Sequence, residues 1–299
     1  MGAPYVELIF ELGELPAATA EAACEACGAI AVTFTAANAP PVLEPLPGEF
    51  RLWSATRVHA LFCANTATSS DSAAARALAG ALGLPLASLR TRRVADKVWE
   101  REWLKDFRAM RFGTRLWVCP HHETVADAEA CVVYLDPGLA FGTGTHATTR
   151  LCLEWLEQHV TPGARVIDYG CGSGILALAA IKLGAAHAFC FDIDPQALLA
   201  TADNARANAL EAQVSVCADA DLLPDAADVL VANILAAPLC ALAARFGQLV
   251  RPGGALVLAG LMEDEAFEVT RANGACFDMQ PCAKRAGWVA LSGRRREHC

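Results

Sequence analysis

Short apolar runs alternate with helical stretches from residue 161 to the end of the chain. Five runs predict strands at 164–168, 188–192, 213–217, 228–232 and 254–259. The intervening segments predict helices at 174–183, 195–208 and 236–249, a glycine-rich turn at 248–254, and two final paired strands at 275–280 and 287–293. Strands that alternate with helices in this way predict a doubly wound α/β domain.

The N-terminal third follows a different order. Apolar alternation predicts strands at 5–12, 29–35, 56–63 and 86–94, and helical patterns at 15–27 and 71–82. The order β-α-β-β-α-β predicts a small α+β, ferredoxin-like sandwich. That fold also occurs in RNA-binding modules, which stack bases on paired strand aromatics. Because no such aromatic-rich strand is present, the pattern favours a domain that holds a protein partner.

An aromatic segment at 96–120 separates the two patterns. Trp99, Trp103 and Phe107 have the spacing i, i+4, i+8, which places them along one stripe of a helix. A connecting helix that docks this stripe on a neighbouring domain is favoured over an aromatic cage. The expected organisation is a recognition domain at 1–94, a connecting helix or linker at 95–115 and a second domain at 116–299.

Composition and charge narrow the function classes. The 299 residues are 55% hydrophobic with mean hydropathy +0.32, but no run approaches the roughly 18 apolar residues that a membrane span needs. The acidic N-terminus does not resemble a signal peptide, so a soluble, cytoplasmic protein is expected. The net charge of -9 argues against direct nucleic-acid binding and favours a basic partner. The 13 scattered cysteines, with one CxxC at Cys24 and Cys27, predict buried reduced thiols and no metal site.

Two glycine-rich segments lie close together: DPGLAFGTGTHATT at 136–149 and VIDYGCGSG at 166–174. Glycine allows the backbone to approach a ligand closely. A dinucleotide fingerprint that starts at Gly170 needs a third glycine at the position of Ile175, and a Walker loop needs a Gly-Lys pair that is absent. The glycines therefore argue against a phosphate site.

The spacing DxGxGxG, from Asp168 through Gly170 and Gly172 to Gly174, resembles motif I of S-adenosylmethionine-dependent methyltransferases. In that family the turn wraps the methionine part of the cofactor, and an acidic residue after the second strand holds the ribose. The resemblance implies this role for Asp192, whereas Asp194, followed by Pro195, is expected to cap a helix. Asp219 is either an adenine contact or a loop acid.

Asn233 ends the fourth expected strand, where N-methyltransferases of this family carry an Asn or Asp that accepts from the target amine. Ile234 and Leu235 replace the usual proline-aromatic pair, which favours an aliphatic amine over a flat base. Together, DPGLAFGTGTHATT, GCGSGILALAA, DIDPQAL and ANILAAPL resemble the bacterial methyltransferase family of large-subunit ribosomal protein eleven, over nearly the whole chain.

This resemblance implies a seven-stranded, Rossmann-like class I methyltransferase domain behind the ferredoxin-like domain. It also implies that S-adenosylmethionine is the cofactor, and that lysine side chains and the α-amino group of that basic ribosomal protein are the methyl acceptors. Asn233, with support from His146, is the expected catalytic residue. The expected cofactor-binding residues are Phe141, Gly142, Thr145, Thr149, Asp168, Gly170, Gly172, Asp192 and Asn233.

Two groups of alternatives remain. The first is an S-adenosylmethionine-dependent methyltransferase of another protein, a nucleic-acid base or a small molecule. The acidic charge and the missing aromatic pair after Asn233 weigh against a base. The second group is a non-catalytic S-adenosylmethionine-binding protein or a nicotinamide oxidoreductase. Ile175 argues against the oxidoreductase, although the fold alone does not exclude it.

Overall fold

A computed structural model describes residues 5–37, 52–63, 69–94, 107–135 and 142–298. The chain divides into two compact units, Met1–Trp99 and Glu100–Cys299, and each is described by itself. In the described part of the chain no helix is long and apolar enough to cross a membrane.

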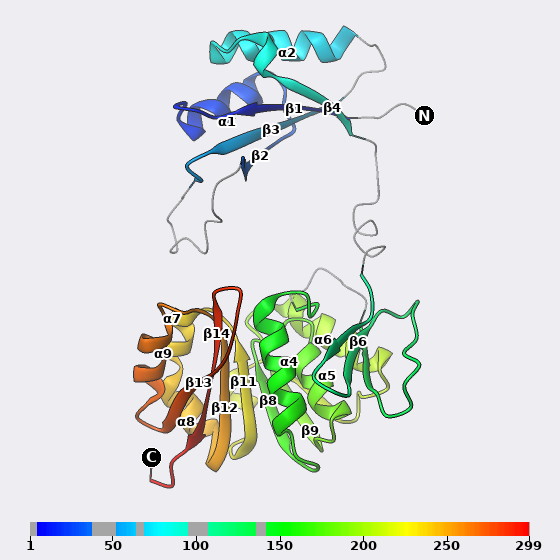
Figure 1. Ribbon diagram of the computed structural model, residues 1–299, viewed down its shortest axis with the longest axis vertical. Coiled ribbons are helices and arrows are strands. Elements are labelled where there is room, and N and C mark those ends of the chain that lie inside the picture. The colour runs from blue at the N-terminus through cyan, green and yellow to red at the C-terminus, as the bar shows by residue number, and fades with distance from the viewer. Residues whose placement is uncertain (1–4, 38–51, 64–68, 95–106, 136–141, 299) are drawn as a thin grey trace. The chain divides into compact units, whose positions relative to one another are not determined.

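The N-terminal unit is a four-stranded antiparallel sheet with strand order β2-β3-β1-β4 (Figure 1). Val6, Leu8 and Phe10 point alternately from β1 into a core shared with the two helices. The strand expected from residue 86 starts later, because a 3-10 turn follows Pro85. The elements are β1 (Tyr5–Glu11), α1 (Ala17–Ala26), β2 (Ala31–Ala36), β3 (Thr56–Cys63), α2 (Ser69–Leu82), the turn Leu86–Ser88 and β4 (Arg90–Val94).

The second unit is built on a seven-stranded sheet with order β10-β9-β8-β11-β12-β14-β13. β10, β9, β8, β11 and β12 are parallel, and β14 and β13 add antiparallel strands at one edge. From β8 the strand order runs to β9 and β10 on one side and to β11 and β12 on the other, so the order reverses between β8 and β11. In open α/β sheets, ligands bind beyond the carboxyl ends of the strands at such a point. The strands are β8 (Arg165–Tyr169), β9 (His187–Phe191), β10 (Val214–Cys217), β11 (Ala227–Asn233), β12 (Val250–Met262), β13 (Phe277–Arg285) and β14 (Trp288–Arg295).

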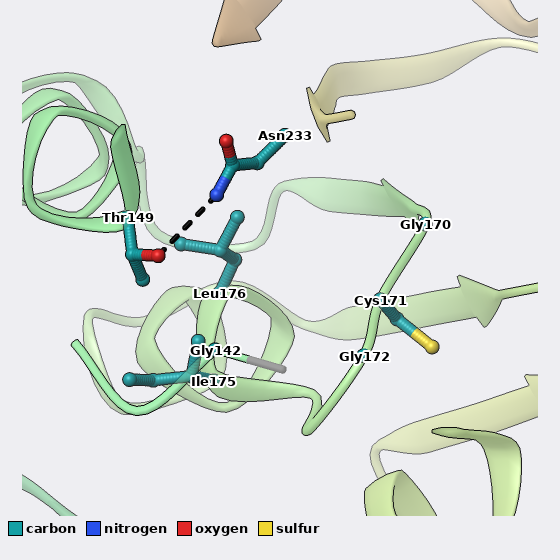
Figure 2. Close-up of a pocket in the computed structure, with 8 residues that line it drawn as sticks. All are labelled: Gly142, Thr149, Gly170, Cys171, Gly172, Ile175, Leu176 and Asn233. Carbon is teal, nitrogen blue, oxygen red and sulfur yellow. Dashed lines mark hydrogen bonds between the residues drawn. The ribbon is translucent and has the colours of Figure 1, made fainter. Parts of the chain in front are cut away.

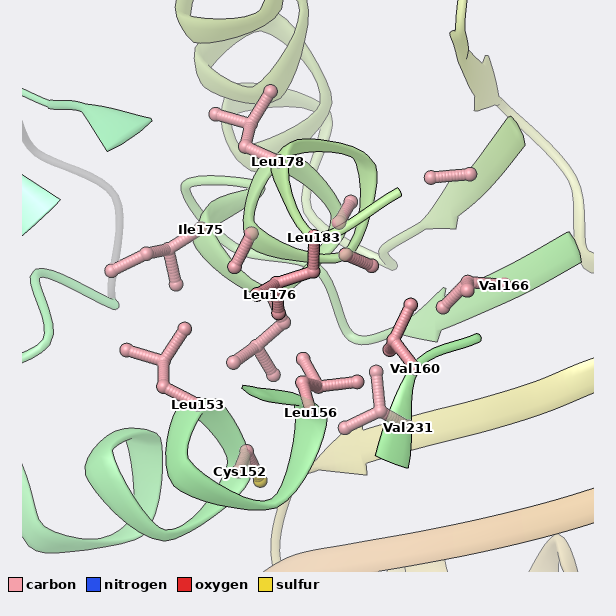
Figure 3. Packing of buried hydrophobic residues seen from close by; sticks show 14 of the residues in the cluster. Cys152, Leu153, Leu156, Val160, Val166, Ile175, Leu176, Leu178, Leu183 and Val231 are labelled. Atoms are coloured by element: carbon pink, nitrogen blue, oxygen red, sulfur yellow. The ribbon is translucent and has the colours of Figure 1, made fainter. Parts of the chain in front are cut away.

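Helices cover both faces of this sheet and bury two separate hydrophobic clusters. Figure 3 shows the first cluster, in which Leu153 and Leu156 of α4 pack with Leu176 of α5 and Val231 of β11. The single helix expected at 236–249 is two helices, because Leu242 leaves helical geometry with φ -88° and ψ 0°. The helices are α4 (Ala147–His159), α5 (Ile175–Lys182), α6 (Pro195–Ala207), the 3-10 helix η3 (Ala220–Leu222), α7 (Ala236–Ala241), α8 (Ala243–Leu249) and α9 (Ala266–Asn273).

A three-stranded sheet precedes α4 and was not expected. It consists of β5 (Met110–Phe112), β6 (Leu116–Cys119) and β7 (Cys131–Tyr134). The expected connecting helix is therefore wrong at its C-terminal part, where Phe107 is not helical and β5 begins three residues later; Trp99 and Trp103 lie outside the described residues. Local pairing across a turn at Gly113, whose φ is +65°, replaces the helical stripe there.

Glu157 of α4 anchors this hairpin. Its carboxylate accepts hydrogen bonds from the Thr114 hydroxyl at 2.6 Å and from the backbone N–H groups of Thr114 and Arg115. Desolvation alone raises the pKa of Glu157, but these hydrogen bonds outweigh it and hold the pKa below its usual value. The carboxylate thus fixes β5 and β6 against the helix whose other end begins at the candidate site.

β12 is longer than expected, and it pairs with β11, the strand that ends at the candidate site. Residues 250–254, expected as a turn, belong to the strand, which pairs with β11 on both sides of a register shift. Near its end, Gly260 has φ +88°, and a Cβ on it would lie 2.3 Å from the carbonyl oxygen of Ile234. Only glycine at position 260 allows the two backbones to approach this closely, and the contact holds Ile234, the residue that follows Asn233.

We expect Gly260→Ala to destabilise the protein more than Gly163→Ala. Both glycines have positive φ, at +88° and +84°, but a Cβ on Gly163 meets nothing within 4 Å. The φ strain alone is about 1–2 kcal/mol, and overpacking against Ile234 adds about 1–3 kcal/mol. Urea unfolding of both variants measures the difference, and equal losses would contradict the proposed contact.

Candidate active site

A cavity lies at the carboxyl ends of β8 and β11, between the starts of α4 and α5 (Figure 2). Five residues expected from sequence line it: Gly142, Thr149, Gly170, Gly172 and Asn233. Three further lining residues, Cys171, Ile175 and Leu176, come from the same glycine turn and the helix after it. The two glycine-rich segments and the end of the fourth parallel strand therefore share one site.

The glycine turn presents its backbone to the cavity. Gly170 and Gly172 have φ +81° and +53°, in the left-handed region that favours glycine. A Cβ on Gly170 would lie 2.3 Å from the Ile234 side chain, so this position also requires glycine for packing. The N–H groups of Gly170 and Cys171 both donate to the carbonyl of Phe191, which ties the turn to the end of β9.

A direct hydrogen bond joins the two glycine-rich segments. The Ser173 hydroxyl donates to the carbonyl oxygen of Gly142 at 2.5 Å. Gly144, two residues after Gly142, is also closely packed, because a Cβ on it would lie 3.2–3.4 Å from Phe112, Met110 and Ile175. Ser173 is a residue that the sequence analysis missed, and its place inside the glycine turn was the available signal. Phe141 lies outside the described residues.

The start of α4 brings Thr149 to the cavity, and His146, which does not line the cavity, precedes it by three residues. His146 is the N-cap residue, and its Nδ1 lies 2.7 Å from the Thr148 hydroxyl. Its ring packs against that of Trp288 of β14 in a T-shaped arrangement, with ring centroids 5.0 Å apart. Thr149 is buried, and its hydroxyl accepts a hydrogen bond from Asn233 Nδ2 at 3.3 Å. Thr145 is exposed and does not line the cavity; its hydroxyl lies 2.9 Å from that of Thr143.

Three acidic residues follow the strands near this edge. Asp192, directly after β9, accepts hydrogen bonds from the N–H groups of Gly172 at 2.9 Å and Asp194 at 3.0 Å. Asp194 caps α6 through Gln196 N–H with Pro195 behind it, which confirms that prediction. Asp219 caps the 3-10 helix η3 through Asp221 N–H, so its observed contact is that of a loop acid. Asp192 is therefore the acid in direct contact with the glycine turn.

Asp168 lies within β8, with no exposed surface. Its Oδ2 accepts one hydrogen bond, from Ala177 N–H of α5 at 3.1 Å, while Oδ1 has no partner among the described residues. Burial raises the pKa of Asp168 to about 7, against the lowering effect of the Ala177 hydrogen bond and with a smaller contribution from the Asp192 charge. Asp168 does not line the cavity, so the structure places it behind the glycine turn.

All but one of the cysteines that the structure describes are free thiols. Among the residues that the structure describes, no group of three or more His, Cys, Asp or Glu side chains is arranged to hold a metal ion. Cys24 is buried and Cys27 half-buried, both with free thiols, and burial raises the pKa of Cys24 to about 11. The expectation of reduced thiols is wrong at Cys276, which is disulfide-bonded.

The chemistry of the cavity lining suits a cofactor that carries no phosphate. None of its eight lining residues is a lysine or an arginine. The backbone of Gly170 and Gly172 lines the cavity and suits an amino-acid moiety. Asp192 does not line the cavity, but its carboxylate, which accepts from Gly172 N–H, is an acceptor for hydroxyl groups at the strand end. These features match the nucleoside and methionine parts of S-adenosylmethionine.

We expect the free energy of unfolding of Asp168→Asn, relative to that of the natural protein, to increase as pH rises. The folded-state pKa of Asp168 is raised to about 7, above about 3.9 for an unfolded Asp. The contribution of Asp168 to the stability of the natural protein is therefore fully present below the unfolded pKa and is lost as pH rises towards the folded pKa. The advantage of Asp168→Asn should grow by about 3 kcal/mol from about pH 5 to about pH 8. Urea unfolding, with exposed Asp203→Asn as control, tests this; parallel pH profiles would contradict it.

Known proteins resemble the chain over nearly its whole length. The profile of the family described as Ribosomal protein L11 methyltransferase (PrmA) matches residues 4–296. A relative from Pseudomonas aeruginosa, named ribosomal protein L11 methyltransferase, is 48% identical over 294 residues, covering 98% of this chain and 99% of the relative. One of the same name from Methylococcus capsulatus is 49% identical over 272 residues, covering 90% and 92%.

A solved structure agrees with these relatives. The crystal structure of the ribosomal protein L11 methylase from Lactobacillus delbrueckii subsp. bulgaricus superposes with a TM-score of 0.59 at 27% identity. It covers 64% of this chain and 100% of its own. The second unit thus has a Rossmann-like methyltransferase fold, and the chain belongs to the ribosomal protein L11 methyltransferase family.

Proposed function

We propose that this protein transfers methyl groups from S-adenosylmethionine to lysine side chains and the α-amino group of ribosomal protein L11, in the cytoplasm. The observation that carries the proposal is the position of Asn233. Its carboxamide lines the same cavity as the two glycine-rich segments and is oriented by Thr149. The names and coverage of the relatives favour L11 over another protein, a base or a small molecule as acceptor.

The proposed cofactor site uses the residues of both segments. Gly170 and Gly172 hold the methionine part with their backbone, and Asp192 accepts from the ribose hydroxyls. Gly142 and Thr149 close the opposite side of the cavity. We assign supporting contacts to Phe141 and Thr145, and a supporting role from behind the glycine turn to Asp168, which has no exposed surface. When bound, the cofactor supplies a methyl group on a positively charged sulfonium.

The methyl acceptor must arrive as a neutral amine. For a lysine with its ordinary pKa near 10.4, the free-energy cost of being neutral near pH 7.4 is about 4 kcal/mol. A desolvated cavity beside a positive charge lowers that pKa and reduces the cost. Because Asn233 Nδ2 donates to Thr149, its Oδ1 is the atom that accepts from the incoming amine and orients its lone pair. Holding nucleophile and methyl carbon near attack distance contributes several kcal/mol.

His146 has a supporting role in this proposal. Its Nδ1 lies against the Thr148 hydroxyl and its ring edge contacts Trp288, so the ring is held at the start of α4, three residues before Thr149. A histidine fixed there can receive the proton that the amine gives up. Oriented hydrogen bonding rather than strong base catalysis remains the main contribution of the protein.

The N-terminal unit is the proposed recognition domain for L11. Its strand order, β2-β3-β1-β4, with both helices contributing to one core, supports a ferredoxin-like fold for residues 1–94. The proposed connector of residues 95–115 includes β5, which pairs with β6, and residues 116–299 are the proposed seven-stranded class I methyltransferase domain. The net charge of -9 suits a basic protein substrate rather than direct contact with nucleic acid.

Incubation with methyl-labelled S-adenosylmethionine and separated ribosomal components tests the proposed function. The expected result is label on L11 alone, at lysines and the α-amino group when the protein is digested and its peptides are sequenced. Label on ribosomal RNA, on other proteins only, or on no component would contradict the proposal.

The matched variants in the same assay are Asn233→Ala and Asp203→Asn. Because Asn233→Ala no longer positions the amine, its turnover should be roughly 100-fold lower than that of the natural protein, while its cofactor affinity changes little. Asp203 forms an exposed ion pair with Arg206 on α6, so its replacement should leave both quantities unchanged. Equal losses of cofactor affinity and turnover in Asn233→Ala would contradict the role given to Asn233.

A further inference from the structure

Asp168 is a buried carboxyl group with too few hydrogen-bond donors for an ion. It has no exposed surface, one hydrogen bond to Oδ2, and an Oδ1 that contacts no donor in the described part of the chain. Buried carboxylates that stay ionised accept several hydrogen bonds or pair with a cation. The geometry at Asp168 supplies neither in full, which favours the neutral acid.

The groups around Asp168 reinforce this conclusion from every element packed on it. Cys152 faces it from α4, Cys190 lies opposite on β9, and Asp192 follows that strand. Val231 lies opposite on β11. These neighbours are thiols, an acid and an apolar side chain. Among the described residues no lysine or arginine forms an ion pair with Asp168, so a negative charge there is uncompensated by the protein.

The carboxyl group lies directly behind the cavity floor. Asp168 precedes Gly170 by two residues, and its donor Ala177 follows Leu176; both Gly170 and Leu176 line the cavity. Cys152 lies about one helical turn after Thr149, a third lining residue. A charge placed in the cavity is therefore close to a buried group in a poorly screened environment, where electrostatic interactions are strong.

We infer that Asp168 is a neutral acid in the free enzyme and releases its proton to solvent when a sulfonium enters the cavity. Asp168 then becomes the counter-charge of the methyl donor, S-adenosylmethionine, and returns to the neutral acid when the uncharged thioether product remains. This inference rests on the proposed cofactor. It makes Asp168 a specificity-determining residue that separates the charged donor from its neutral product, S-adenosylhomocysteine.

The consequence is a pH-dependent preference between the two ligands. Burial raises the pKa of Asp168 to about 7, so the free enzyme gives up this proton in the neutral range. Donor affinity should rise about tenfold for each unit by which the sulfonium lowers that pKa, as pH rises from below the lowered value to above the raised one. Product affinity, which gains nothing from the carboxylate charge, should not show this rise.

Isothermal titration calorimetry of the full-length protein tests the inference. Each ligand is titrated near pH 7 in phosphate and in Tris, whose different ionisation enthalpies report the number of protons released. We expect release of about half a proton with S-adenosylmethionine and substantially less with S-adenosylhomocysteine. The difference should vanish in Asp168→Asn and persist in Asp203→Asn, whose side chain is exposed.

Equal proton release with both ligands, or a difference that persists in Asp168→Asn, would overturn the inference. If Asp168→Asn does not fold, the comparison of the two ligands on the natural protein decides by itself. Binding of both ligands without a proton difference would leave the proposed function intact. Absence of binding heat and of competition by either ligand would instead contradict the cofactor assignment under the proposed function.

Discussion

The close packing of Ile234 between two glycines is the constraint on which the site depends. A Cβ on Gly170, at the end of β8, would lie 2.3 Å from the Ile234 side chain, and a Cβ on Gly260, in β12, would lie 2.3 Å from its carbonyl oxygen. Both glycines have positive φ. The residue after Asn233 is therefore held by strands on both sides of β11, which fixes where the carboxamide of Asn233 meets the glycine turn.

A second set of contacts assembles the cavity around that fixed point. Ser173 joins the glycine turn to Gly142, Asp192 joins it to the end of β9, and Thr149 joins α4 to Asn233. Each contact connects segments that are far apart in sequence, so the cavity forms only when the whole sheet and the start of α4 are in place. Such a site is preorganised for a ligand, and preorganised groups position reacting atoms most effectively.

Much of this arrangement was predictable from the sequence, for identifiable reasons. Alternation and glycine spacing are local signals, and they located β3, β8 and the Asp194 cap nearly to the residue. The β5–β7 sheet was missed because its strands are three or four residues long and its first hairpin is held by Glu157, 42 or more residues away. The role of Ser173, and the lack of a partner for Asp168 Oδ1 among the described residues, are tertiary properties that no local pattern encodes.

We propose that both glycine-rich segments enclose one phosphate-free ligand from opposite sides. A crystal structure of the protein with S-adenosylhomocysteine tests it most directly. We expect a ligand whose amino-acid part contacts Gly170 and Gly172, whose ribose hydroxyls reach Asp192, and whose other side contacts Gly142 and Thr149. A ligand bound outside this cavity, or one that contacts the glycine turn but nothing between Gly142 and Thr149, would contradict it.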